Sequence, residues 1–315
     1  MSRWILHHYG LSPYAEKARL LLGFKGASWR SVAVSPLPPR PGLQPVFGAF
    51  RRIPVLQRGA DYFVDTRLMA EVLDSVTPSP PLFPTHARAV SMLIANWAEP
   101  RAFVMMGPVR FESRDDVQPL LEAGIHPGDF LRDRAPFMAP AVDTRRSGSV
   151  RGSARDHVLI YLAVLDDLLR AGGQYLCGNQ PTAADFSAYH TLWWLRQPPQ
   201  RDAVLQRVPA LCAWADRMAA IGHGRSEPMT PDEALHEARA AQGEAPWRPD
   251  WPTVEDERIG QAMTLTADDY GRDPMAGTVS AMSDRHVTLT REAPGVGTVR
   301  VHFPKVGYEL GAASA

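Results

Sequence analysis

The sequence predicts a multi-domain protein with an α/β part, an all-α part and a small β part, in that order. Residues 3–80 alternate short apolar runs with amphipathic helical stretches. Leucines at helical spacing dominate the middle of the chain, and from residue 259 the pattern changes to Thr, Val and Gly with a period of two. The predicted boundaries are 1–78, 85–225 and 226–315.

The N-terminal part opens with a strand over 4–6, followed by a turn and a helix. Ser12 occupies an N-cap position, and Pro13 falls at the first helical position, where its missing N–H has no cost. A hydroxyl at such a turn lies beside free backbone N–H groups and the positive end of the helix dipole. These groups favour a bound anion, including a thiolate.

The rest of the first part reads as a strand at 29–34, a proline-rich loop, a hairpin around Arg58-Gly59 and a helix at 65–73. Pro54 lies inside a strand pattern, which indicates an edge position or a special backbone shape such as a cis peptide bond. At the start of the last helix, the acidic residue Asp65 is followed by Thr66, which carries a hydroxyl group.

The middle part, after a linker at 75–85, contains several helical patterns. Residues 87–97 show one apolar face, and 158–169 and 211–221 have apolar residues at helical spacing. Thr182 and Asp185 have the spacing of a capping box before a buried helix. We expect a loop-rich insertion at about 100–152, mobile over 144–152.

The last part begins with a helix at 230–241, opened by a capping box of Thr230 and Glu233. Short runs with a period of two then predict about four strands in a small antiparallel sheet or barrel. They lie at 263–266, 277–279, 287–290 and 298–303.

Composition excludes several classes of function. The 34 basic and 34 acidic residues give no net charge, and no basic stripe suggests nucleic-acid binding. Two cysteines without a CxxC pattern argue against a disulfide framework and a zinc site, and His7 and His8 in one strand face opposite ways, so they do not share a metal. No apolar run approaches the ~20 residues of a membrane span, and no signal peptide is present. We therefore expect a cytoplasmic protein without a metal, a membrane contact or a nucleic-acid partner.

Three motifs occur in a fixed order: SPYAEKAR in the first helix, RRIPVL, and DTRLMAEVLD. Their order and spacing resemble the N-terminal domain of the cytosolic glutathione transferase superfamily, which is thioredoxin-like. The threonine-to-aspartate cap at residue 182 is also similar to that of the family's helical domain. The β-rich extension after residue 226 departs from ordinary members.

The resemblance implies an enzyme that binds reduced glutathione as a co-substrate, stabilises its thiolate and adds it to a small electrophile, as in detoxification. It also implies a homodimer. Two other interpretations stay open. One is a non-catalytic binding or scaffold protein on the same fold, and the other is a glutathione-dependent lyase or isomerase.

The resemblance also implies the catalytic residue. Ser12 would donate a hydrogen bond to the sulfur of glutathione, or else only cap the helix. Tyr9 is a rival donor, because some branches of the family use a tyrosine after the first strand.

The resemblance assigns the glutathione-binding residues as well. Ile53, before a cis Pro54, would pair its backbone with the cysteinyl part, the alternative being an ordinary edge-strand proline. Asp65 and Thr66 would hold the γ-glutamyl end, or else only cap a helix. Arg52, with Arg51 before it, would meet the glycyl carboxylate or lie in solvent.

Overall fold

The computed structural model describes residues 3–111, 114–138, 147–197, 205–247, 252–269 and 271–312. They form two compact units. The first comprises Met1–Ala18, Lys25–Thr77 and His223–Ala315, and the second comprises Arg19–Phe24 and Pro78–Gly222. The chain after residue 222 thus belongs to the same unit as the N-terminal residues, while the three-part boundaries stay a prediction.

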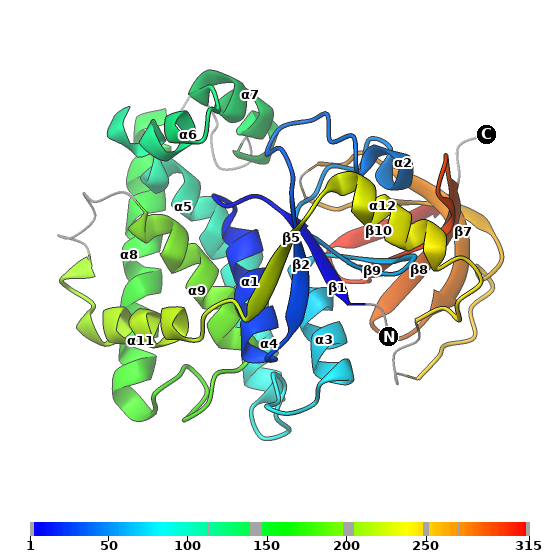
Figure 1. The fold of residues 1–315 in the computed structure, drawn as a ribbon. Helices are drawn as coiled ribbons and strands as arrows, with labels where there is room; N and C mark the ends of the chain where they lie inside the picture. Colours follow the sequence, from blue (N-terminus) through cyan, green and yellow to red (C-terminus); the bar gives the residue numbers. More distant parts are fainter. Residues whose placement is uncertain are drawn as a thin grey trace. The chain divides into compact units, whose positions relative to one another are not determined.

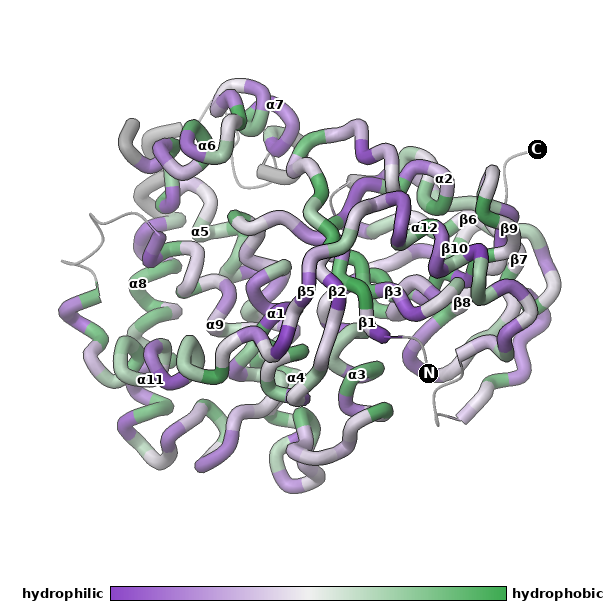
Figure 2. The backbone as a smooth tube through the Cα atoms, viewed as in Figure 1, coloured by the Kyte–Doolittle hydropathy of each residue, from purple (hydrophilic) through white to green (hydrophobic). Residues whose placement is uncertain are grey.

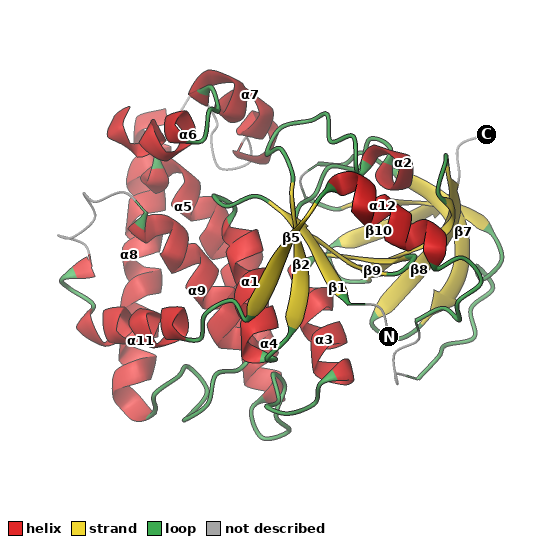
Figure 3. Cartoon of the chain, in the orientation of Figure 1, coloured by secondary structure: helices red, strands yellow, loops and turns green. Residues whose placement is uncertain are grey.

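The first unit contains the predicted thioredoxin-like arrangement. Strand β1 pairs in parallel with β2 and antiparallel with β3, and β3 pairs antiparallel with β4. The elements follow one another as β1 (Trp4–His8), α1 (Pro13–Phe24, of which Arg19–Phe24 is assigned to the second unit), β2 (Ser28–Ala33), α2 (Gln44–Phe47), β3 (Val55–Arg58), β4 (Asp61–Val64) and α3 (Thr66–Val76). The order β4-β3-β1-β2 and the helices between the strands confirm the predicted fold class (Figures 1 and 3).

The four strands are the middle of a larger sheet. Strand β9 joins β4 in parallel, and β5 joins β2 in parallel at the other edge. The complete order is β10-β6-β7-β8-β9-β4-β3-β1-β2-β5. The added strands are β5 (Arg225–Met229), β6 (Ala262–Ala267), β7 (Met275–Met282), β8 (His286–Ala293), β9 (Gly297–Pro304) and β10 (Tyr308–Ala312).

The predicted C-terminal antiparallel sheet is therefore confirmed, with one strand more than the four expected. Strands β5 and β10 were not predicted, because neither shows a clear period of two: β5 reads RSEPM and is largely exposed, and β10 reads YELGA. The pairing of β9 with β4 was also not predicted, because it joins residues more than two hundred positions apart.

A single apolar core joins the C-terminal strands to helix α2 and to β4. Along β9, hydrophobic and hydrophilic residues alternate (Figure 2), and Val299, Val301 and Phe303 are fully buried. Helix α12 (Pro231–Ala240) begins at the predicted capping box and buries Leu235 in the same core. Its carbonyl at Ala234 accepts a hydrogen bond from Gln57 of β3 at 2.9 Å.

The second unit is all-helical over its described residues. It contains α4 (Arg88–Trp97), the π-helical turn η1 (Ala98–Ala102), α5 (Phe103–Arg110), the 3-10 turn η2 (Arg114–Val117), α6 (Gln118–Glu122), α7 (Pro127–Met138), α8 (Ser147–Gly172), α9 (Ala183–Arg196) and α11 (Pro209–Ala220). In the described part of the chain, no helix is long and apolar enough to cross a membrane.

The predicted loop-rich insertion at about 100–152 is wrong, because much of it is helical. The prolines of this segment are compatible with helices: Pro119 and Pro127 lie in first turns, where they are tolerated, and Pro108 lies inside α5. The segment 144–152 was expected to be mobile. Helix α8 begins within it, at Ser147, and residues 144–146 lie outside the described ones.

The cap of α9 is confirmed. The buried carboxylate of Asp185 accepts hydrogen bonds from the backbone N–H groups of Thr182 and Leu176, both at 2.8 Å, and from the indole N–H of Trp214 at 2.9 Å. Burial raises the pKa of Asp185, although these donors oppose the shift. The carboxylate thus ties α9 to α11.

Candidate active site

Ser12 lies at the turn between β1 and α1, where the sequence placed it. Its side chain is buried, and its Oγ accepts a hydrogen bond from the N–H of Ala15 at 3.1 Å. Ser12 therefore caps α1. A hydroxyl that accepts one bond still carries its own hydrogen, and among the described residues this hydrogen meets no acceptor. Capping thus leaves Ser12 able to donate to a ligand.

Tyr9 directly follows β1, begins the same turn and is partly exposed. Its carbonyl accepts the N–H of Ser12 at 3.2 Å, so the two predicted donors belong to one local structure.

The Ile53–Pro54 peptide bond is cis. Pro54 comes just before β3, which starts at Val55. Within the described residues, the backbone N–H and C=O of Ile53 take part in no ladder and no other hydrogen bond. An unpaired backbone at the end of a strand is able to pair with an extended peptide, as an added strand would.

Asp65 and Thr66 lie at the start of α3. Asp65 has φ +75° and is the one non-glycine residue in the described ranges with positive φ. Such a conformation costs about 1–3 kcal/mol and is found preferentially at functional sites. The Oδ1 of Asp65 accepts the N–H of Arg67 at 2.9 Å, so Asp65 caps the helix. The Oγ1 of Thr66 is buried and has no hydrogen-bond partner in the described structure. A buried hydroxyl is normally paired, so the Thr66 hydroxyl is available to pair with a polar group of a ligand.

The strand register brings these three features to one end of the sheet. His7, at the end of β1, lies opposite Val55 at the start of β3, and Val55 lies opposite Val64 at the end of β4. Ser12 follows β1, Ile53 precedes β3, and Thr66 follows β4. The hydroxyl turn, the unpaired backbone and the strained helix start therefore share the same end of the sheet.

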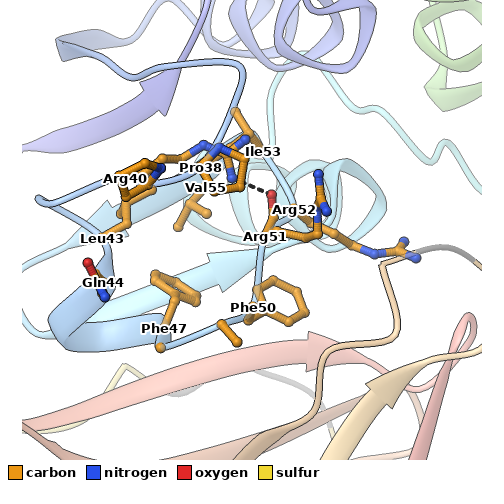
Figure 4. Close-up of a pocket in the computed structure, with 13 residues that line it drawn as sticks. Pro38, Arg40, Leu43, Gln44, Phe47, Phe50, Arg51, Arg52, Ile53 and Val55 are labelled. Atoms are coloured by element: carbon orange, nitrogen blue, oxygen red, sulfur yellow. Dashed lines mark hydrogen bonds between the residues drawn. The ribbon is translucent and has the colours of Figure 1, made fainter. Parts of the chain in front are cut away.

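A pocket of about 340 Å³ lies next to Ile53 (Figure 4). Arg40, Gln44 and Arg52 are among its polar lining residues. Arg40 donates to the backbone carbonyls of Ser35 at 2.7 Å, Pro36 at 2.8 Å and Arg51 at 2.6 Å, so it fixes the loop against the segment before Ile53. The guanidinium of Arg40 thus forms part of a polar wall of the pocket, held by three backbone carbonyls.

Arg52 does not simply lie in solvent. Its guanidinium forms an ion pair with Asp269, and its Cζ lies 5.4 Å from the ring centroid of Tyr308. Burial lowers the pKa of Arg52, but the nearby Tyr308, Asp269 and Asp65 outweigh this effect and raise it. Arg52 therefore stays a cation between the acid of α3 and the C-terminal sheet.

The sequence did not single out Arg40, Asp269 or Tyr308. Asp269 and Tyr308 come to this place only through the pairing of β9 with β4, for which there was no local signal. Among the described residues, no group of three or more His, Cys, Asp or Glu is arranged to hold a metal ion.

The arrangement suits a small acidic peptide with a thiol. The unpaired backbone at Ile53 fits an extended chain, and Thr66 at a helix N-terminus fits a carboxylate. The carboxylate of Asp65 fits an ammonium, and the helix start at Ser12 favours a thiolate over a thiol. The roles of Ser12, Tyr9, Arg52, Ile53, Pro54, Asp65 and Thr66 nevertheless stay predictions.

Two family models match the chain. The model for the glutathione S-transferase N-terminal domain matches residues 6–81, and the model for the C-terminal domain matches residues 125–217. A comparison with curated proteins gives no match.

Several solved structures are similar. A GST-like protein from Pseudomonas syringae shares 29% identity, with 99% of this chain and 100% of that chain covered and a TM-score of 0.80. The match therefore extends over the C-terminal strands. A glutathione transferase family member from Pseudomonas fluorescens, solved with two glutathione bound, shares 14% identity over 70% of this chain and 89% of that one, with a TM-score of 0.52. A beta-etherase from a Sphingobium species shares 19% identity over 69% and 95%, with a TM-score of 0.51.

Proposed function

Because the chain belongs to the glutathione S-transferase family, we propose that it is an enzyme that binds reduced glutathione and transfers its thiolate to a small electrophile. The single observation that carries the proposal is the buried Oγ1 of Thr66 at the start of α3, which has no hydrogen-bond partner in the described part of the chain. It lies at the same end of the sheet as the unpaired backbone of Ile53. The γ-glutamyl carboxylate would pair with Thr66, its ammonium with Asp65, and the cysteinyl backbone with Ile53.

The polar pocket next to Ile53 would take the glycyl end of glutathione. It contains Arg40 and Gln44, and it is adjacent to the cysteinyl position because Ile53 itself lines it. The glycyl carboxylate would displace water from the pocket and accept charge-assisted hydrogen bonds from its polar side chains.

Ser12 would donate its hydroxyl hydrogen to the sulfur. A free thiol has a pKa of about 8.5, so only a few per cent is ionised at pH 7. Lowering this pKa by about 2 units requires about 2.7 kcal/mol of stabilisation of the thiolate, which one charge-assisted hydrogen bond and a helix dipole supply together. The thiolate then attacks an electrophilic carbon, and the electron pair of the broken bond leaves with the displaced group or moves onto the conjugated acceptor. No metal is required.

A second candidate is cleavage of an ether by the same thiolate. The fold similarity to the beta-etherase from Sphingobium favours it. The attack would be identical, but the leaving group would be an alkoxide or phenoxide that takes up a proton. A scaffold function is less well supported, because the C-terminal strands continue the sheet of the glutathione-binding unit instead of forming a separate module.

We also propose a cytoplasmic homodimer without a nucleic-acid or membrane partner. In the helical unit, apolar side chains are exposed on α4 and α8, where Trp97 packs on Tyr161 at a ring-centroid distance of 4.8 Å. They are Val90, Leu93, Trp97, Ile160, Val164 and Leu168. We call this set the α4–α8 strip. A second copy of the chain would cover it.

The proposal is tested by titrating reduced glutathione into the wild-type protein near pH 7 and following thiolate absorbance by difference spectroscopy. We expect a saturable thiolate signal, and we expect Ser12→Ala to lose it and to lower turnover with a reactive aryl halide by about 10- to 100-fold. Ser12→Thr, which keeps both the cap and the donor, should retain most of the signal.

An unchanged thiolate signal in Ser12→Ala would overturn the role of Ser12 and leave Tyr9 as the donor, which Tyr9→Phe would then test. Heat of binding without thiolate would favour a carrier. The absence of any binding would reject the enzyme proposal in favour of a scaffold.

A further inference from the structure

Two side chains of the C-terminal sheet reach the candidate site. Asp269, just after β6, forms the ion pair with Arg52, and Tyr308 of β10 lies under the same guanidinium. Asp269 follows Arg52 by 217 residues. Neither residue lies in the segments matched by the two family models, which end at residues 81 and 217.

The position of Tyr308 is unusual for a core residue. Its ring packs on Phe303 at 5.3 Å inside the core of the C-terminal sheet, and its buried hydroxyl interacts with Arg52. Burial raises the pKa of Tyr308, and the neighbouring Asp65 acts in the same direction while Arg52 opposes it. The polar tip of Tyr308 therefore faces the charges of the site and not solvent.

Arg52 connects this tip with the start of α3. It lies one residue before Ile53 and interacts electrostatically with Asp65, the neighbour of Thr66. A cation in this place complements a carboxylate that pairs with the Thr66 hydroxyl. A long arginine side chain has many rotamers, so binding through Arg52 is efficient only if its guanidinium is held beforehand.

We propose that Arg52 binds the α-carboxylate of the γ-glutamyl head together with Thr66, and that Asp269 and Tyr308 are positioning residues that hold the Arg52 guanidinium there. This assignment rests on the proposed function, because it requires glutathione as the ligand. Asp269 holds one end of the guanidinium by charge. Tyr308 supports it with the face of its ring and with its hydroxyl oxygen, which interacts with Arg52 and is the group that Tyr308→Phe removes. The C-terminal sheet is then a working part of the glutathione site.

The test compares two ligands by calorimetry on the full chain: reduced glutathione, and γ-aminobutyryl-cysteinyl-glycine, which lacks only the α-carboxylate. We expect the wild type to bind glutathione at least about tenfold more tightly than the analogue. Asp269→Asn and Tyr308→Phe should each weaken glutathione binding about three- to tenfold and leave analogue binding unchanged. In an Arg52→Met background, Asp269→Asn should have no further effect.

Matched controls are Asp268→Asn, which removes a neighbouring exposed charge, and Tyr62→Phe, which removes the buried hydroxyl of a second core tyrosine, one without a hydrogen-bond partner in the described structure. Neither should change the preference for glutathione. Asp269 has a side-chain exposure of 52%, so its variant will fold even if Tyr308→Phe does not.

Three outcomes would overturn the inference. Equal losses for both ligands would mean that Asp269 and Tyr308 act on the fold and not through Arg52. Unchanged glutathione binding in both variants would reject their role while leaving the proposed function intact. Failure of the wild type to bind glutathione would reject the proposed function and this inference together.

Discussion

Asp61 of β4 makes several polar contacts where the thioredoxin-like strands meet the C-terminal sheet. Its carboxylate accepts hydrogen bonds from Nε and Nη2 of Arg300 at 2.7 and 2.8 Å, and contacts Nε2 of His302 at 2.8 Å. The backbone N–H of Trp247 approaches it at 3.3 Å. Burial would raise the pKa of Asp61, but the bonds from Arg300 and His302 lower it.

We predict that Asp61→Ala lowers the free energy of unfolding by about 3 kcal/mol or more, because it leaves the Arg300 cation partly buried without its partner. Urea unfolding followed by tryptophan fluorescence measures the change. Asp256→Asn serves as the control. It weakens a local ion pair between Asp256 and Arg258, which lie two residues apart in the sequence, and it should change the free energy of unfolding little. A loss below about 1 kcal/mol for Asp61→Ala would contradict a structural role for this network.

At this scale, sequence reasoning identified the residues whose neighbours are local. Ser12, Asp65 and Thr66 were found because a helix start needs a cap and the cap follows directly from the adjacent residues. Arg52 was placed at the site, but its surroundings were not. Asp269 and Tyr308 depend on a strand pairing between distant residues, and no pattern within β6 or β10 indicates what they contact.

Helices α4 and α8 show that a sequence pattern also fails to indicate what a whole element packs against. The apolar spacing of 87–97 correctly predicted a helix, but Val90 and Leu93 are 54% and 70% exposed in the chain. Periodicity finds an apolar face without identifying what covers it. Elements with caps, such as α9 and α12, were predicted well. The helices from residue 98 to residue 122 were not predicted, and none of the three whose caps are described, η1, α5 and α6, has a side-chain cap that a sequence pattern could reveal.

We predict that Leu93→Glu converts a dimer to a monomer, because it places a charge in the middle of the α4–α8 strip that a second copy would bury. Light scattering coupled to size-exclusion chromatography measures the mass. Leu121→Glu, at a similarly exposed leucine on α6, should leave the mass unchanged. A monomeric wild type, or a Leu93→Glu variant that is still a dimer, would exclude the strip as the interface.

For the whole molecule, buried histidines make stability depend on pH. Burial lowers the pKa of His7 to about 4 and that of His286 to about 4. Gln57 partly opposes the shift at His7. At His286 the cationic forms of His302 and Lys305 add to the shift, and Asp284 opposes it.

An unfolded histidine has a pKa of about 6.5, so the unfolded chain binds protons first as the pH falls. We therefore predict that these two histidines add no pH dependence to the free energy of unfolding above pH 6.5. Between pH 6.5 and 4 they lower the free energy of unfolding as the pH falls. His286→Gln should reduce this slope by up to about 1.4 kcal/mol per pH unit, measured by urea unfolding at several pH values. His236→Gln, which replaces an exposed histidine of α12, should leave this slope unchanged. Parallel slopes for the wild type and His286→Gln would contradict the prediction.

The position of β9 beside β4 has a consequence for the order in which the protein is made. The first unit uses residues before 78 and after 222, so its sheet lacks six of its ten strands until the last part of the chain leaves the ribosome. Most of the helical unit, by contrast, is available earlier. Synthesis therefore exposes both edges of the central strands for most of translation, and a nascent chain of this protein has more need of chaperones than one whose N-terminal domain is complete at once.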